Sequence, residues 1–249
     1  MRFQKPIIIL LAAVFSGCGQ APEIVSKDYK YEKFLYETHI YSFDIHLENI
    51  RNFNKASRLI ENLIYQNKNF DEYTAYTEDE FTSKFNSEAY PPMTDEDGQE
   101  YFYHSDLIMS YSVEYYNDSF IIIKYQTYVY YAGGAHGNYG IRYFIIDIAG
   151  KKVLGIDEIL NQIPENILRK MIEEKYNISY YLREEIWPPD TINIYNDNIE
   201  LTWNTYTITP YSDGIIYIEI PKETVQPYLT EKGRTLMLSI TDDNRERGK

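Results

Sequence analysis

The sequence predicts an α+β fold in which helices pack on one face of a mainly antiparallel sheet. Several segments alternate apolar and polar residues as half-buried strands do, whereas others repeat apolar residues at helical spacing. The chain also contains 27 tyrosines, and aromatic residues favour strands. Helical segments and hairpins alternate irregularly along the chain, which is typical of this fold class.

The first half of the chain is predicted to contain a strand followed by two helices. Residues 39–48 alternate strictly between apolar and polar, which indicates a strand with one buried side. Apolar residues then recur at helical spacing over residues 53–67. A second helix is expected to start at Thr77, because Thr77 and Glu80 fit the capping-box pattern. Residues 91–98, which contain two prolines and an acidic run, predict a solvated loop.

Strands are expected to dominate the rest of the chain. The alternation predicts strands at residues 107–115, 121–129, 139–148, 192–195, 199–203, 214–220 and 235–240. The first two of these flank Asn117 and Asp118 and should form a hairpin. Helices are expected from Pro164 to about Asn177 and from Pro221 to Leu229, because proline is favoured at the start of a helix.

The N-terminus is predicted to be a lipoprotein signal peptide, residues 1–17. It carries Arg2 and Lys5, an apolar run, two small residues and then Cys18. The apolar run is shorter than the about 20 residues that a membrane-spanning helix needs. Cys18 is the only cysteine, and lipid attachment to its thiol would explain a lone cysteine in an exported protein. The alternative is an ordinary signal peptide with an incidental cysteine.

Cleavage before Cys18 would leave a lipidated tether, residues 18–27, which show no clear periodicity. No acidic cluster follows the anchor, so we expect the periplasmic face of the outer membrane. The formal net charge is −14, and removal of Arg2 and Lys5 with the signal would make it −16. Such a surface repels nucleic acid and anionic lipid headgroups. We therefore expect no nucleic-acid partner and membrane attachment through the lipid anchor only.

The second half of the chain contains two motifs. The first is Tyr130-Tyr131-Ala132-Gly133-Gly134-Ala135-His136-Gly137, followed by Asp147-Ile148-Ala149-Gly150-Lys151. The second is Leu201-Thr202-Trp203-Asn204, followed by Tyr206, Pro210-Tyr211, Gly214 and Ile218 to Pro221. In this order the motifs resemble the RsiV/PdaC-type extracytoplasmic domains, a domain family of unknown function with a GGAHG motif.

The resemblance implies an α+β fold and a role in the cell envelope. It also implies two closely associated subdomains: a companion subdomain, residues 28–129, and the RsiV/PdaC-type domain itself, residues 130–245. In RsiV-like proteins this region binds and senses lysozyme, and in PdaC-like proteins it precedes a peptidoglycan deacetylase domain. Neither an anti-sigma segment nor a deacetylase domain is recognised here, so we expect neither sigma-factor signalling nor deacetylation. The partners implied are peptidoglycan or a lysozyme-like protein.

The GGAHG segment supplies the candidate binding residues. Its glycines permit positive φ and close backbone approach, so we expect a turn or bulge between two strands. The candidate contact residues are Tyr130, Tyr131, Gly133, Gly134, His136 and Tyr139. For His136 three interpretations stay open: a histidine that fixes its own loop, a ligand contact, or a general base. The tyrosines could likewise stack on sugars or simply belong to the sheet.

No catalytic, metal-binding or cofactor-binding residue is assigned from the sequence. The four histidines are scattered, and neither a nucleophile elbow nor a phosphate-binding loop occurs. Three functions therefore remain: a non-catalytic binding or sensing module, a glycan-acting enzyme with carboxylates paired by folding, and a structural envelope protein that docks to another protein. We favour the binding module.

Overall fold

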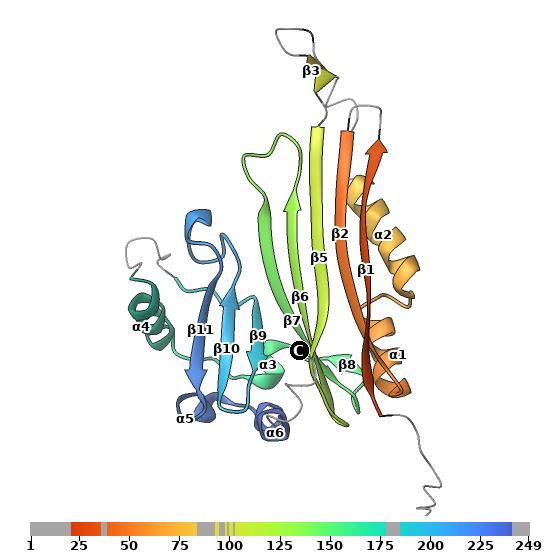
Figure 1. Cartoon of the computed structure of the whole chain (residues 1–249). Coiled ribbons are helices and arrows are strands. Elements are labelled where there is room, and N and C mark those ends of the chain that lie inside the picture. Colours follow the sequence, from red (N-terminus) through yellow and green to blue (C-terminus); the bar gives the residue numbers. More distant parts are fainter. Residues whose placement is uncertain are drawn as a thin grey trace, which may run out of the picture.

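A six-stranded sheet organises the molecule (Figure 1). The computed structural model describes residues 21–35, 39–83, 93–94, 98, 100–101, 103–177 and 185–240. The sheet has the order β1 (Glu23–Leu35), β2 (His39–Arg51), β5 (Tyr103–Tyr116), β6 (Phe120–Tyr130), β7 (Asn138–Asp147) and β8 (Lys152–Val153). Strands β2 and β5 are parallel, and the other neighbours are antiparallel. A short hairpin, β3 (Met93–Thr94) with β4 (Glu100–Tyr101), precedes β5.

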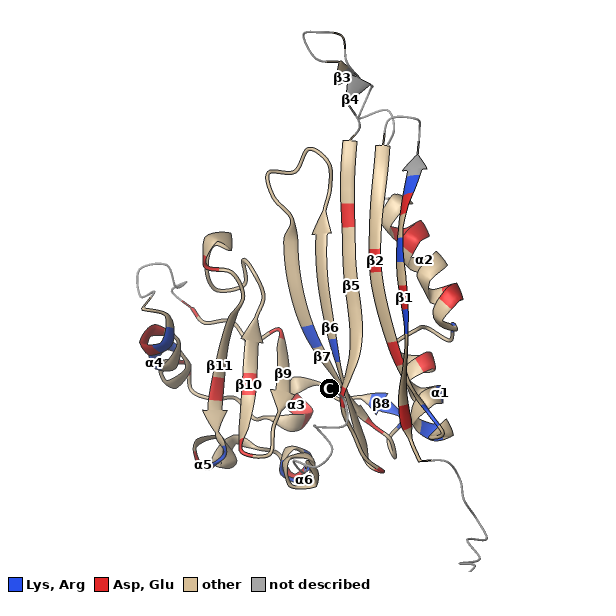
Figure 2. Cartoon of the chain, viewed as in Figure 1, with Lys and Arg blue, Asp and Glu red and all other residues tan. Residues whose placement is uncertain are grey.

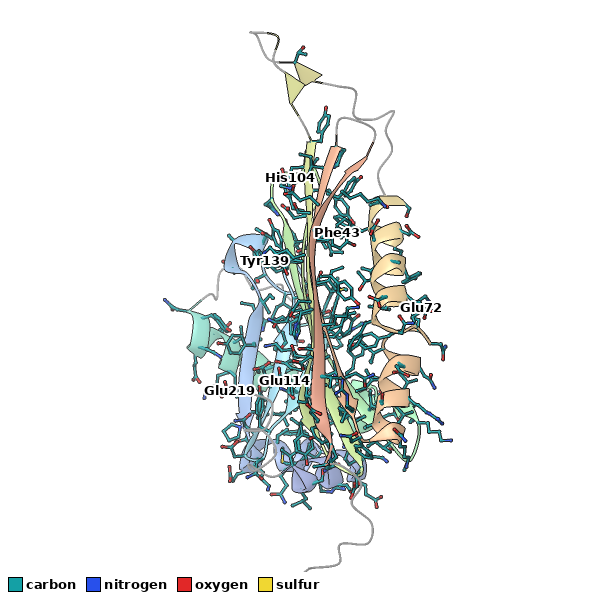
Figure 3. All side chains as sticks on the ribbon, turned by 45° about the vertical axis from the view of Figure 1, so that its right-hand side comes forward. Phe43, Glu72, His104, Glu114, Tyr139 and Glu219 are labelled. Atoms are coloured by element: carbon teal, nitrogen blue, oxygen red, sulfur yellow. The ribbon has the colours of Figure 1, made fainter. Side chains whose placement is uncertain are left out.

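Two helices, α1 (Asn54–Leu63) and α2 (Phe70–Ser83), cover one face of this sheet. Alternate residues of β2 are fully buried beneath them, as the strict alternation of that segment predicts. Phe43 is one of these residues, and Figure 3 shows it on the sheet side of α2, whereas Glu72 lies on that helix's outer side. Phe43 also stacks on Tyr31 of β1, with ring centroids 5.0 Å apart.

A second layer covers the lower part of the opposite face (Figure 1). Its three-stranded sheet has the order β11 (Ile216–Pro221), β10 (Asn198–Trp203) and β9 (Thr191–Ile194). With it pack α3 (Ile156–Ile159), α4 (Glu165–Tyr176), α5 (Lys222–Val225), α6 (Glu231–Ser239) and two 3₁₀ turns, η2 (Tyr211–Asp213) and η3 (Gln226–Tyr228). Trp203 is fully buried in this layer. The α+β prediction is thereby confirmed.

The strands of the large sheet contribute to two hydrophobic cores. In β6, Ile121 and Ile123 face the core under α1 and α2, whereas Ile122 faces the core shared with the second layer. The division expected between residues 129 and 130 falls at the end of β6, which pairs with β7 along ten residues of one sheet. The two halves of the chain therefore share a continuous hydrogen-bonded layer.

Three expectations about elements were wrong. Residues 23–27, expected in the tether, form the start of β1 and pair with β2. Helix α2 starts at Phe70 and not at Thr77. The helix begins earlier because Asn69 and Glu72 form a capping box. The Asn69 side chain accepts from the Glu72 backbone N–H at 3.0 Å, and the Glu72 carboxylate accepts from the Asn69 N–H at 3.0 Å. Thr77 lies inside the helix and donates to the Tyr73 carbonyl.

The third correction concerns residues 235–240, expected to be a strand. Residues 231–239 form helix α6. The Thr230 hydroxyl caps this helix by accepting from the Gly233 N–H at 3.0 Å, and Leu236 and Met237 are buried on its inner side. The hairpin at Asn117, the helix after Pro164 and the strands β9 to β11 are confirmed. Residues 1–20, which include Cys18, and most of the expected loop at residues 91–98 lie outside the described residues.

Candidate functional site

The GGAHG segment is the connection between β6 and β7, as predicted. Gly133 has a φ of 82°, and the Gly134 N–H donates to the Tyr131 carbonyl at 2.9 Å. Gly137 is required for a different reason, because a Cβ at this position would lie 2.1 Å from the ring of Tyr128. The glycines thus provide one left-handed residue and one close approach of backbone to an aromatic side chain.

His136 ties this loop to the segment after β10. The Nδ1 of His136 donates to the Gly137 carbonyl at 2.9 Å, so Nε2 accepts from the Tyr206 hydroxyl at 3.0 Å. Its ring stacks on Tyr211 with centroids 3.7 Å apart, and the Tyr211 hydroxyl donates to the same Gly137 carbonyl at 2.6 Å. These contacts support the interpretation of His136 as a residue that fixes its loop, and they join the two sequence motifs in space.

The second motif also completes the outer edge of β7. Asn204 accepts from the Ile141 N–H at 2.7 Å and donates to the Ile141 carbonyl at 3.1 Å. Thr191 accepts from the Tyr143 N–H at 2.7 Å. These side chains replace a neighbouring strand, which protects an otherwise open sheet edge. Asp190 holds Asn204 in place by accepting from its backbone N–H at 2.7 Å.

A groove of about 570 Å³ lies beside these contacts, lined by residues of β5, β6 and β7 and by Ile215, which directly precedes β11. Its aromatic walls are Tyr128 and Tyr139, whose ring centroids are 4.6 Å apart. Tyr139 is 51% exposed, and Figure 3 shows it on the side of the sheet away from α2. The remaining lining combines apolar and polar residues: Ile108, Ser110, Gln126, Thr127, Gly140, Ile141 and Ile215. Ile108 is itself 50% exposed.

The structure distributes the candidate residues unevenly around this groove. Tyr139 lines it, whereas His136, Gly133 and Gly134 belong to the loop above it. Tyr131 faces the other side of the sheet and stacks on Phe81 of α2, with centroids 5.1 Å apart. Tyr130 is half-buried beside Gly134.

Three aromatic residues of this surface were not among the candidates from the sequence. Tyr128 lies two residues before Tyr130 on the same face of β6, so the strand alternation could have indicated it. Tyr206 and Tyr211 belong to the second motif, but their contact with His136 depends on folding. Tyr206 is 49% exposed and extends the aromatic surface beyond the groove.

The Asp147 part of the first motif is structural. Its carboxylate accepts from the N–H groups of Ala149 and Gly150 and from the Lys232 ammonium, at 3.0, 3.1 and 2.6 Å. Burial by itself would raise the pKa of Asp147, but Lys232 and the two N–H groups together lower it. Gly150 is needed here because a Cβ would lie 2.9 Å from the Asp147 carboxylate.

The other histidines lie elsewhere on the large sheet. His39 is buried against the Ser105 hydroxyl at 3.0 Å, and that hydroxyl accepts from the Ala132 N–H at 2.9 Å, which positions the start of the GGAHG loop. His46 contacts Asp28 and Glu48. Among the residues that the structure describes, no group of three or more His, Cys, Asp or Glu side chains is placed to hold a metal ion. No helix in the same part of the chain is long and apolar enough to span a bilayer.

Comparison with known proteins finds a family match within the second half of the chain. Residues 151–223 match a family model described as a protein of unknown function, DUF3298. The GGAHG motif lies before the matched residues, and the motif around Trp203 and Tyr211 lies within them. No curated protein matches the sequence.

Two crystal structures of DUF3298 family proteins share the fold. The protein from Bacteroides fragilis has a TM-score of 0.65 and 19% identity, and the match covers 89% of this chain and 98% of that one. The protein from Pseudomonas aeruginosa has a TM-score of 0.55 and 14% identity, with 86% and 96% covered. Both matches extend well beyond residues 151–223, so the first half of the chain shares in the common architecture.

Proposed function

We propose that this chain is a lipid-anchored cell-envelope protein whose domain binds peptidoglycan glycan strands in the groove beside Tyr128 and Tyr139, without acting on them chemically. The observation that carries the proposal is the groove itself. It combines an exposed aromatic wall, an aliphatic floor and polar side chains, and it lies at the junction of the two sequence motifs.

The chemistry of a sugar ring matches this lining. A pyranose presents C–H groups on its faces and hydroxyl groups at its rim, so a tyrosine ring can cover a face while polar side chains bind the rim. In the groove, Tyr139 and Tyr128 offer ring surface, and Ser110 and Gln126 offer hydroxyl and amide groups. The volume of about 570 Å³ lies within the roughly 300–1,000 Å³ of small-ligand sites. The resemblance to PdaC-type domains supports the same wall-directed role.

Removal of Tyr139 tests the ligand. Tyr139→Ala should weaken co-sedimentation with purified peptidoglycan by at least about fivefold, since a central aromatic contact typically contributes more than 1 kcal/mol. Tyr217→Ala is the matched control, because Tyr217 is a 41% exposed tyrosine on β11 and does not line the groove. Equal binding by the two variants would exclude the groove as the binding site, and no binding of peptidoglycan by the unaltered chain would exclude this ligand.

The anchor is tested separately at Cys18. Cys18→Ser should release the protein from the membrane fraction and abolish the mass of the attached lipid. Protein that stays in the membrane fraction with an unchanged mass would contradict acylation of this residue. This outcome would leave the groove and its ligand unaffected, because the domain begins after the anchor.

A cationic lysozyme-like protein is the second candidate partner, favoured by the net charge of −14 and by the resemblance to RsiV-type domains. Electrostatic attraction over long range should speed its association. The association rate with lysozyme should then fall steeply above about 0.15 M salt, where the screening length is about 8 Å. Binding to lysozyme that survives Tyr139→Ala and depends on salt would favour this partner over the glycan.

A further inference from the structure

The base of the molecule carries four basic side chains, which we call the basic corner: Arg51 at the end of β2, Lys55 and Arg58 on α1, and Lys151 in the turn before β8. Helix α1 packs beside β8, so these residues share one end of the molecule (Figure 2). All four are exposed, and none forms an ion pair among the residues that the structure describes.

The chain enters the fold at this same corner. The Ala21 carbonyl accepts from the Asn52 side chain at 3.1 Å, and the Pro22 carbonyl accepts from the Tyr116 hydroxyl at 3.3 Å. Asn52 directly follows Arg51 in the chain, so Ala21, the first residue that the structure describes, lies next to the basic corner. Cys18 precedes Ala21 by three residues, which span at most about 10 Å when fully extended.

The charge of the corner differs from that of the rest of the molecule. Helix α2, which lies further from the base, carries five acidic residues: Asp71, Glu72, Glu78, Asp79 and Glu80 (Figure 2). Three acidic residues lie near the corner. Glu23 is opposite Arg51 in the β1–β2 pairing, and Glu61 follows Arg58 by one turn. The third, Asp147, accepts from the Gly150 N–H next to Lys151 and is paired with Lys232. The net charge predicts that the chain as a whole is repelled by an anionic membrane, but the end closest to the anchor carries unpaired positive charge.

We propose that the basic corner rests on anionic phospholipid headgroups and that this contact orients the domain on the membrane. Because the chain from Cys18 to Ala21 spans at most about 10 Å, lipid attached at Cys18 holds the corner at a distance close to the screening length of about 8 Å, where basic side chains are attracted to the bilayer surface. The groove beside Tyr139 lies toward the opposite end of the large sheet (Figure 3), so this orientation directs it away from the bilayer. The inference rests on the proposed anchor and not on the ligand of the groove.

The single cysteine allows a test that does not depend on acylation in the cell. The chain from Cys18 onward is coupled through its thiol to maleimide lipids in vesicles of phosphatidylcholine, with or without about a third phosphatidylglycerol. Lysines are then modified with an amine-reactive reagent, and each site is quantified by mass spectrometry. The rate at which Lys55 and Lys151 are modified should fall several-fold in the anionic vesicles only. At about 1 M salt, where the screening length is about 3 Å, this rate should return to its value in neutral vesicles. Lys170 and Lys175 on α4 should react equally in both.

Variants test the role of charge while keeping both reporter lysines. Arg51→Glu/Arg58→Glu should abolish the protection, since each basic side chain contributes roughly fivefold to the attraction. Arg51→Gln/Arg58→Gln should reduce it by less. The matched control, Lys170→Glu/Lys175→Glu, makes the same change in net charge and should leave Lys55 and Lys151 protected. The proposal would be overturned if Lys55 and Lys151 were equally protected in neutral vesicles, or if the arginine changes left their protection unaltered. Protection of Lys170 and Lys175 in their place would overturn it as well. Failure of Cys18 acylation in cells would count against the anchor but would not alter these results.

Discussion

The contact between Gly137 and Tyr128 predicts a specific coupling between two residues of the candidate site. A Cβ at position 137 would lie 2.1, 2.3 and 2.5 Å from Cε2, Cζ and Oη of Tyr128, whereas carbon atoms in contact normally stay about 3.5–4.0 Å apart. In Gly137→Ala the tyrosine ring must therefore move or the loop must shift. Overpacking of this kind costs about 1–3 kcal/mol of unfolding free energy.

The expected loss corresponds to a measurable change in melting temperature. For a chain of this size, about 1 kcal/mol lowers Tm by about 2–4 °C, so Gly137→Ala should lower it by about 2–12 °C. Because the displaced ring forms the Tyr128–Tyr139 pair, peptidoglycan binding should weaken as well. Tyr128→Ala removes the obstruction, so adding Gly137→Ala to that variant should cost at least about 1 kcal/mol less than in the unaltered chain.

Gly214→Ala provides the control for this double-mutant cycle. Gly214 has a φ of 72° and no neighbouring atom within 4 Å of an added Cβ, so the substitution costs only backbone strain, about 1–3 kcal/mol. Its effect should add to that of Tyr128→Ala within about 0.5 kcal/mol. Urea unfolding of the single and double variants measures both cycles. Additive effects for Gly137→Ala with Tyr128→Ala would refute the steric argument.

Three further predictions concern stability. Asn204→Ala should lower the unfolding free energy measured in urea by about 2 kcal/mol or more, because both backbone groups of Ile141 lose their partner. A change of less than about 0.5 kcal/mol, as for a neutral surface substitution, would contradict the role of Asn204 in capping the edge of β7. Burial alone would lower the pKa of His46, but hydrogen bonds to Asp28 and Glu48 raise this pKa above 6.5. The contribution of His46 to the unfolding free energy is therefore complete below pH 6.5 and is lost as the pH rises through the raised pKa. His46→Asn should remove this dependence. For His39, burial and a smaller effect of His104 lower the pKa to about 4. The stability that neutral His39 contributes above pH 6.5 is therefore lost as the pH falls toward 4. An NMR titration in which His39 becomes protonated near pH 6.5 would contradict this prediction.

Local sequence predicted the strands well wherever one side of the strand is buried and the other is not. In β2 and β5 the burial follows the two-residue alternation along most of each strand, since successive side chains point to opposite faces. The turn at Asn117 was equally local: its side chain accepts from the N–H groups of Ser119 and Phe120, both at 2.8 Å. Pro164 likewise marks a helix start that needs no distant contact.

Where two local patterns competed, packing decided between them. Both Asn69–Glu72 and Thr77–Glu80 fit a capping box, but the helix that starts after Asn69 also includes Tyr73 and buries it, which a start at Thr77 would not. Residues 235–240 alternate well enough for a strand, but the Thr230 cap and the burial of adjacent Leu236 and Met237 require a helix. Short apolar runs are compatible with both periodicities, so their environment sets the outcome.

Local sequence patterns predicted most of the strands and helices of this protein and identified the two motifs at its candidate site. Tertiary structure alone decided that His136 meets Tyr206 and Tyr211, some 70 residues later in the chain, and that Tyr131 faces the core while Tyr139 lines the groove. It also placed unpaired basic side chains from β2, α1 and the turn before β8 at the end where the chain enters. Local preferences act over a few residues, whereas these juxtapositions follow from strand pairing and layer packing between distant segments, which spacing along the chain does not encode.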